Sequence, residues 1–164
     1  MILKNFRINA FTTTKLLGNP ACVVPLKKWL SDEILLKIAK KNNVSETAYF
    51  INENSKFSIR WFTPDIEMDL CGHATLAAAH YINKHLNFNF ETILFNSNIG
   101  KLSVNILNDL YQLDFPKREP IESELPEEIY NSLSIKPDKV LKSRDYVLVY
   151  NNIDDVIDIK INRN

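Results

Sequence analysis

The sequence predicts an α+β fold in which a curved, mostly antiparallel sheet wraps around one central buried helix. Three observations support this class. Short runs that alternate apolar and polar residues fill the first two thirds of the chain, a pattern typical of strands with one buried face. The segment after Gly72 is apolar nearly all round, which is typical of a core helix. Its alanines are small enough to let strands pack closely around it.

The strand pattern is clearest in residues 5–10, 57–61 and 102–106, where every second side chain is apolar. A further strand is expected over residues 47–52. We also expect a hairpin around Asn108 and Asp109, because both residue types tolerate the left-handed backbone of a tight turn. Antiparallel pairing of the flanking segments follows from that hairpin.

One surface helix is expected to open at Ser31. Asp32 and Glu33 would lie in its first turn and several lysines near its end, which matches the preferences of helix caps and of the helix dipole. The residues expected on its buried stripe are Ile34, Leu35, Ile38 and Ala39.

The chain is expected to contain one complete domain and the beginning of a second. Residues 1–115 carry the strand and helix patterns and form the complete domain. Residues 116–144 contain four of the seven prolines among many charges, which predicts a linker with one short helix. Residues 145–164 begin with a strand that we expect to be buried, followed by the start of another helix. We expect this second domain to be truncated.

Composition limits the classes of function. The chain has 164 residues, 45% of them hydrophobic, and 20 basic side chains balance 20 acidic ones. That balance argues against binding to nucleic acid or to a membrane surface. No segment reaches the roughly 18 unbroken apolar residues of a spanning helix, and the N-terminus lacks the features of a secretory signal. We therefore expect a cytoplasmic protein in which both cysteines are thiols.

The first candidate site is the run Cys71, Gly72 and His73 at the start of the core helix. A helix N-terminus offers unpaired N–H groups and a positive dipole end, so a substrate carboxylate could bind there with His73 as a further donor. Alternatively, Gly72 is a turn residue, His73 a core histidine and Cys71 a small buried hydrophobe. For isolated residues the second interpretation is favoured, but the adjacency of all three favours a functional site.

The second and third candidates lie in NNVSETAYF and LLGNPACVV. Glu46 stands between a helix end and a strand, where a partly desolvated carboxylate can act as a general acid/base. Taken alone, that stretch favours a surface glutamate beside a turn residue, Ser45. Gly18, Asn19 and Pro20 have the composition of a turn, although the Asn19 side chain could equally point into a site.

No metal site is expected, because the three histidines do not stand at ligand spacing from carboxylates or thiols. The two histidines outside the Cys71 to His73 run, His80 and His85, are expected to be ordinary helix residues. With only three glycines in the chain, a glycine-rich phosphate loop is not expected either.

The segments LLGNPACVV, NNVSETAYF and IRWFTPDIEMDLCGHATLAAA, in this order, resemble the phenazine biosynthesis PhzF-like family of the diaminopimelate epimerase-like superfold. The resemblance extends to about Tyr150. It implies two pseudo-symmetric domains, each with a sheet around a central helix, and catalysis without cofactor or metal. Glu46 would be the acid/base that moves a proton along an allylic system. Contacts to a small, amino-acid-like carboxylate substrate would come from Gly72, His73, Asn19 and Ser45.

Two alternatives to an active isomerase of a biosynthetic pathway remain at this point. Related racemases use a cysteine at this motif as a base, so the chain could be a cofactor-independent racemase or epimerase that uses Cys71. Family members are nearly twice as long, so the chain could also be a truncated remnant or an interaction module without turnover. The expected partner is accordingly a second copy in a homodimer, or a separately encoded second half.

Overall fold

The computed structural model describes residues 2–12, 17–53, 56–86, 91–108 and 110–162. The chain divides into two compact units, a large one, Met1–Phe115, and a small one, Pro116–Asn164. The strands of the large unit are β1 (Phe6–Ala10), β2 (Asn19–Leu26), β3 (Glu46–Glu53), β4 (Lys56–Phe62), β5 (Glu67–Met68), β6 (Thr92–Ser97), β7 (Gly100–Leu107) and β8 (Leu110–Asp114). Its helices are α1 (Asp32–Asn42) and α2 (Gly72–His85).

Within the described residues, the strands of the large unit form one mixed sheet in the order β1-β2-β3-β4-β6-β7-β8, and β5 pairs with β4. Most neighbours are antiparallel, as predicted. The exceptions are β2 with β3 and β4 with β6, which run parallel. Each parallel pair is joined by a helical crossover, α1 in the first case and α2 in the second, because parallel neighbours need a long return connection.

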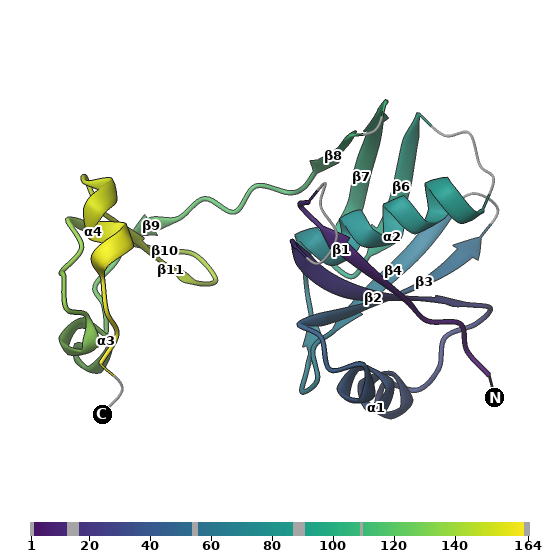
Figure 1. Ribbon diagram of the computed structural model, residues 1–164, viewed down its shortest axis with the longest axis horizontal. Coiled ribbons are helices and arrows are strands. Elements are labelled where there is room, and N and C mark those ends of the chain that lie inside the picture. The colour runs from purple at the N-terminus through teal and green to yellow at the C-terminus, as the bar shows by residue number, and fades with distance from the viewer. Residues whose placement is uncertain (1, 13–16, 54–55, 87–90, 109, 163–164) are drawn as a thin grey trace. The chain divides into compact units, whose positions relative to one another are not determined.

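The two helices lie on opposite faces of the sheet (Figure 1). On β3 the side chains alternate accordingly: Ala48 and Phe50 pack in the cluster with α2, whereas Tyr49 and Ile51 pack with α1. A strand covered on both faces is buried throughout, and Thr47 to Ile51 are buried. The curled sheet around α2 is the predicted α+β arrangement, with α2 as its central helix.

The strands over residues 5–10, 57–61 and 102–106 are confirmed. The hairpin is also confirmed, since β7 and β8 pair antiparallel and Asn108 has a φ of 57°. Asp109 lies outside the described residues. The predicted helix begins after its N-cap Ser31. The prediction of its buried stripe was partly wrong, because Ile34 is 40% exposed, whereas Leu35 and Ala39 are buried as expected.

The turn expected over Gly18, Asn19 and Pro20 includes fewer residues than predicted. Of these three residues only Gly18 lies outside the strand, with a φ of 89°, because β2 already begins at Asn19. A Cβ at Gly18 would collide with the Ala10 carbonyl oxygen, so only glycine fits this close approach of the chain to the end of β1. As a result, Asn19 is held at the end of a sheet strand.

The small unit contains β9 (Ile121–Glu122), α3 (Glu127–Ser132), β10 (Lys139–Lys142), β11 (Tyr146–Val149) and α4 (Ile153–Asp158). Its three strands form a separate antiparallel sheet in the order β11-β10-β9. The expected linker, residues 116–144, therefore contains two strands besides its predicted short helix and belongs to this unit. The strand expected to be buried is only partly covered, since Val147 is 44% exposed.

The helices of the described residues include none that is both long and apolar enough to span a membrane.

Candidate functional site

The site forms where the N-terminal ends of β2, β3 and α2 meet. Because β2 and β3 run parallel with Ala21 opposite Glu46, both strands begin at the same edge of the sheet. Asn19, at the start of β2, therefore lies beside Ser45 and Glu46, at the start of β3. The helix α2 begins nearby and brings His73 into contact with them. Four of the side chains singled out in the sequence thus converge, although no two of the three segments are adjacent in the chain.

Glu46 and His73 face each other across this edge. The Glu46 Oε2 atom lies 3.2 Å from His73 Nε2, and the two side chains are 16% and 9% exposed. The two atoms lie at ion-pair distance but are not aligned for a hydrogen bond. Oε2 is buried and has no hydrogen-bond partner among the described residues. A buried carboxylate oxygen without a partner is unusual, and such a group retains its full capacity to accept a proton or a hydrogen bond.

Ser45 links His73 to the start of β2. Its hydroxyl oxygen lies 3.2 Å from His73 Nε2. The same hydroxyl can donate to Asn19 Oδ1 at 3.3 Å or to the Pro20 carbonyl oxygen at 3.4 Å. Ser45 is therefore more than a turn residue, because it connects the imidazole with both residues that follow Gly18.

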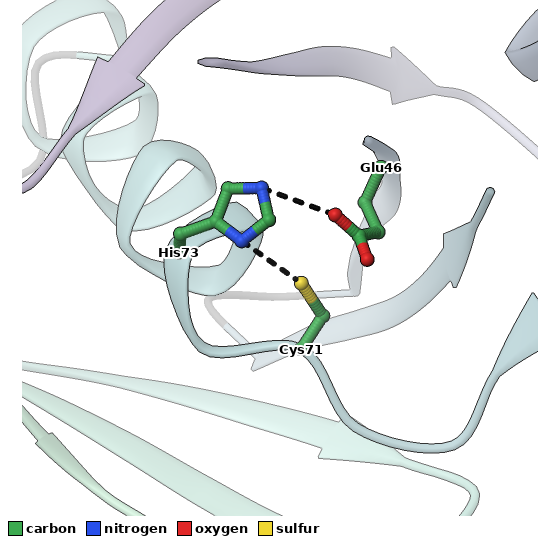
Figure 2. Close-up of side chains that lie close together, drawn as sticks. All are labelled: Glu46, Cys71 and His73. Carbon is green, nitrogen blue, oxygen red and sulfur yellow. Dashed lines mark hydrogen bonds and ion pairs between the residues drawn. The ribbon is translucent and has the colours of Figure 1, made fainter. Parts of the chain in front are cut away.

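Cys71 contacts the other ring nitrogen of His73. Its Sγ atom lies 3.4 Å from His73 Nδ1, and both residues are buried. Figure 2 shows the imidazole between the other two groups, with Nε2 toward Glu46 and Nδ1 toward Cys71. The arrangement depends on the N-cap position of Cys71, where the backbone is extended at φ −144° before the helix begins.

Gly72 is the first residue of α2. A Cβ at this position would lie 3.6 Å from Phe115 and 3.9 Å from Leu113, which are ordinary contact distances. The described part of the protein therefore has room for a larger residue at Gly72. The first turn of α2, residues 72–75, carries no acidic side chain, so its positive dipole end is not offset within the helix.

Burial sets the protonation of His73. Loss of solvent lowers the pKa of the imidazole below its ordinary value of 6.5, against the opposing effects of the Glu46 charge and of a hydrogen bond with the backbone of Pro20. The ring is therefore neutral at pH 7, and it carries one proton on one of its two nitrogens. His73 is a donor on one side and an acceptor on the other.

Three potential metal ligands meet at this site, which the sequence did not predict. One donor atom each from Glu46, Cys71 and His73 lies within 4.8 Å of the others. Ligand spacing along the chain could not reveal the group, because Glu46 is contributed by a distant strand. His73 meets the other two residues through different nitrogens, however, whereas one metal ion would take only one of them. In their present orientation Glu46 and Cys71 approach different nitrogens of the same imidazole (Figure 2).

Comparison with known proteins settles the relationship of the chain. The family model described as "Phenazine biosynthesis-like protein" (PhzC-PhzF) matches residues 8–143. The chain belongs to the PhzF family. An uncharacterized isomerase of Pseudomonas aeruginosa is 41% identical over 149 residues, which are 91% of this chain and 58% of that protein.

Solved structures of PhzF-family proteins share the fold. One from Enterococcus faecalis is 36% identical with a TM-score of 0.85, and the match covers 98% of this chain and 62% of the other. One from Clostridium difficile is 39% identical with a TM-score of 0.82, and the match again covers 98% and 62%. The fold is the diaminopimelate epimerase-like α+β fold that the sequence predicts. The chain spans about three fifths of the length of these relatives.

Within this PhzF-family fold, the two remaining histidines occupy the far part of α2. His80 Nδ1 lies 3.2 Å from the Tyr111 hydroxyl, which also accepts a hydrogen bond from Asn83. His85 stacks on the rings of Phe6 and Tyr81. Both fit the structural roles expected of them. The contact between Cys71 and His73, two residues apart across the start of α2, was not predicted from the sequence.

Proposed function

We propose that the large unit supplies the proton-transfer side of an isomerase that shifts a proton within a small, carboxylate-bearing, amino-acid-like substrate. Glu46 is the acid/base, and His73 binds the substrate carboxylate together with Gly72, Asn19 and Ser45. Membership of the PhzF family supports this assignment, as does similarity to a protein named as an isomerase.

One observation carries the proposal: the buried Oε2 of Glu46, which has no hydrogen-bond partner in the described part of the chain. A structural carboxylate in such a place would be expected to accept hydrogen bonds from the protein. This oxygen is turned toward His73 at the start of α2, where a bound carboxylate would be held by N–H donors and by the positive end of the helix dipole. A substrate anchored there would place its neighbouring carbon close to Glu46.

The chemistry needs no change of oxidation state. The Glu46 carboxylate removes a proton from the carbon next to the substrate carboxylate, and the electron pair of that C–H bond becomes part of the shifted double bond. The protonated Glu46 then returns the proton to the far end of the same allylic system. His73, as a neutral donor, stabilises the negative charge that grows on the carboxylate during the transfer.

The alternative, a racemase that uses Cys71 as its base, is less well supported by the geometry. Cys71 is only 7% exposed, and its thiol is directed at His73 Nδ1. Glu46 is the group with an uncommitted buried oxygen. The isomerase assignment therefore rests on Glu46, and the two readings make opposite predictions for substitutions at Cys71.

The decisive experiment measures incorporation of solvent deuterium into a panel of unsaturated, amino-acid-like acids. The chain is assayed alone and joined to the remaining C-terminal part of its 41% identical relative. Glu46→Gln in the joined protein should reduce exchange about 10²- to 10⁴-fold. Glu53→Gln is the matched control, because Glu53 is an exposed carboxylate at the other end of β3, and exchange should be unchanged. Near-normal exchange in Glu46→Gln would remove Glu46 from its proposed role.

We propose further that the chain without a second half turns over none of these acids above background. The Glu46 and His73 site then stays open to water on one side, which weakens the electrostatic contacts on which proton transfer depends. We propose that this side is closed by a homodimer partner or by a separate chain. Light scattering of the purified chain, combined with the same assay, tests this. A monodisperse monomer with turnover of roughly 1 s⁻¹ or more would contradict it.

A further inference from the structure

The hydrogen bond between Cys71 and His73 can run in either of two directions. The Nδ1 atom of His73 lies 3.4 Å from Cys71 Sγ, and both partners are buried. Either the thiol donates to a bare nitrogen, or an Nδ1–H group donates to sulfur. These two cases place the single proton of the neutral ring on opposite sides, so the groups around Nε2 decide between them.

The Nε2 side of the ring faces oxygen atoms of Ser45 and Glu46. The backbone of Pro20 also interacts with the His73 ring, and a proline has a carbonyl oxygen but no N–H. The Ser45 hydroxyl, 3.2 Å from Nε2, can donate its only proton to Asn19 Oδ1 or the Pro20 carbonyl, in which case its oxygen accepts from Nε2. The third neighbour is the Glu46 carboxylate oxygen at 3.2 Å.

A nitrogen that faces a carboxylate oxygen favours the proton, and a donor at the opposite nitrogen adds to this preference. Since burial keeps the ring neutral, a proton on Nε2 leaves Nδ1 as an acceptor for the Cys71 thiol. The opposite tautomer would place a bare Nε2 3.2 Å from the Glu46 carboxylate oxygen, which is a repulsive contact between two largely buried side chains. Thiols are weak donors, but burial of both partners shields the bond from competition by water.

We propose that Cys71 is a positioning residue whose thiol donates to His73 Nδ1 and thereby holds the imidazole in its Nε2–H tautomer. This proposal rests on the proposed function, because the tautomer keeps a donor turned toward Glu46, where the substrate carboxylate is expected. The thiol stays protonated and transfers nothing to the substrate. Its role is thus different from that of a thiol base in a racemase.

Substitutions at Cys71 separate the hydrogen bond from simple packing. Cys71→Ser keeps a donor at the same place, whereas Cys71→Ala removes the donor and leaves a small apolar side chain. Cys22→Ala is the matched control. Cys22 is also buried, but it borders a separate cavity beside α1, with Ile34 and Ile38 among the lining residues. Amide spectra of all variants show whether the fold is kept.

The first readout needs no substrate. In the purified chain with ¹⁵N-labelled histidine, long-range proton–nitrogen spectra report which ring nitrogen carries the proton, and His73→Gln assigns the signals. At neutral pH we expect the Nε2–H tautomer of His73 in the unsubstituted chain, in Cys71→Ser and in Cys22→Ala. Cys71→Ala should give a mixture of tautomers. An Nδ1–H tautomer in the unsubstituted chain, or an unchanged tautomer in Cys71→Ala, would overturn the proposal.

The second readout is the deuterium-exchange assay of the joined protein. Cys71→Ala should lower kcat about 10- to 100-fold, the cost typical of losing a group that orients a metal-ligating histidine. It should also raise KM, because His73 binds the substrate carboxylate. Cys71→Ser should restore kcat to within about tenfold of the unsubstituted protein. An unaffected kcat in Cys71→Ala would contradict a positioning role. Complete loss in Cys71→Ser, with alkylation of Cys71 as a thiolate, would show a thiol base instead.

The two readouts also keep this proposal separate from the proposed function. If Glu46→Gln retained exchange while the tautomer followed Cys71 as expected, the isomerase assignment would fail and the Cys71 contact to His73 would stand. If Glu46→Gln lost exchange while the tautomer of His73 was the same in Cys71→Ala and in the unsubstituted chain, the isomerase assignment would stand and the positioning role of Cys71 would fail.

Discussion

The large and small units of the chain have similar kinds of secondary structure but very different cores. In the large unit, side chains such as Phe50, Phe57 and Trp61 are almost completely buried around α2. In the described part of the small unit, Leu133 is the only hydrophobic side chain that is buried, with 5% of it exposed. Several apolar residues of the small unit are instead well exposed: Ile121, Ile153, Val156, Ile157 and Ile161.

The difference shows that hydrogen-bonded strands do not by themselves make a stable unit. Stability comes mainly from apolar area removed from water, at roughly 25 cal/mol per Å². A three-stranded sheet with two short helices and one buried leucine removes little of it, whereas two helices on opposite faces of a long sheet remove much. The Glu46 and His73 site lies wholly on the large unit, where the backbone that positions it is well supported.

The largest expected effect is therefore a difference in amide protection between the two units. We expect β3, β4 and α2 to exchange near the free energy of global unfolding, and β10 and β11 to exchange by local opening at a free energy lower by about 5 kcal/mol or more. Hydrogen exchange followed by NMR or mass spectrometry gives both values in one experiment. Equal protection of the two sheets would show that the small unit is as stable as the large one and has support from groups other than its own core.

The sequence indicated much of this fold but not the burial of each part. Alternation identified β1, β4 and β7 because each has one consistently apolar side. The continuous apolar run at Tyr146 to Val149 correctly predicted a strand but wrongly predicted a buried one, since a pattern says which residues could be buried and not whether anything covers them. Ile34 was assigned to the buried stripe of α1 for the same reason.

The site shows a different limit. Asn19, Ser45 and Glu46 meet because β2 and β3 run parallel from one edge, which no local pattern reveals. The roles of these residues came from the resemblance to the PhzF family. The contact of Cys71 with His73 depends on an extended cap residue immediately before the helix, so neither composition nor periodicity could have predicted it.

A second prediction concerns ion pairs, which also differ between the units. Arg60 in β4 makes two hydrogen bonds to Glu67, at 2.7 and 2.6 Å, and one to Asp32 at 2.8 Å, and its side chain is only 17% exposed. Arg60→Met would leave Glu67 partly buried without this partner, so we expect the free energy of unfolding to fall by about 1–3 kcal/mol. Urea denaturation followed by tryptophan fluorescence measures it, since both tryptophans, Trp29 and Trp61, lie in the large unit.

The matched change in the small unit is Lys139→Met, which removes an exposed pair with Glu122. Exposed pairs are screened by solvent and contribute little. We therefore expect the exchange rates of β9 and β10 to stay within error of the unsubstituted chain. If Lys139→Met lowered the free energy of opening of β9 and β10 by as much as Arg60→Met lowers the free energy of unfolding, the small unit would depend on surface charge in place of a core.

The smallest expected effect is the pH dependence of stability, which should belong to the large unit alone, because all three histidines of the chain lie in α2. Burial lowers the pKa of His73 and of His80 below the ordinary value of 6.5, and for His80 the nearby charges of Lys84 and His85 act in the same direction. Below pH 6.5 the unfolded chain therefore binds protons that the folded chain does not. The free energy of unfolding should fall as the pH drops from the ordinary value through the lowered pKa values, and this contribution should be constant above it.

Urea denaturation monitored by tryptophan fluorescence between about pH 7.5 and 5.5 tests the sign, because in this range histidine is the side chain whose ordinary pKa is crossed. His80→Gln should reduce the slope, and addition of His73→Gln should nearly abolish it. The protection of β10 and β11 against exchange, corrected for the intrinsic pH dependence of amide exchange, should not follow the same curve. A free energy of unfolding that rises below pH 6.5, or a slope that survives both substitutions, would show that the buried imidazoles of α2 are not the groups that couple this fold to protons.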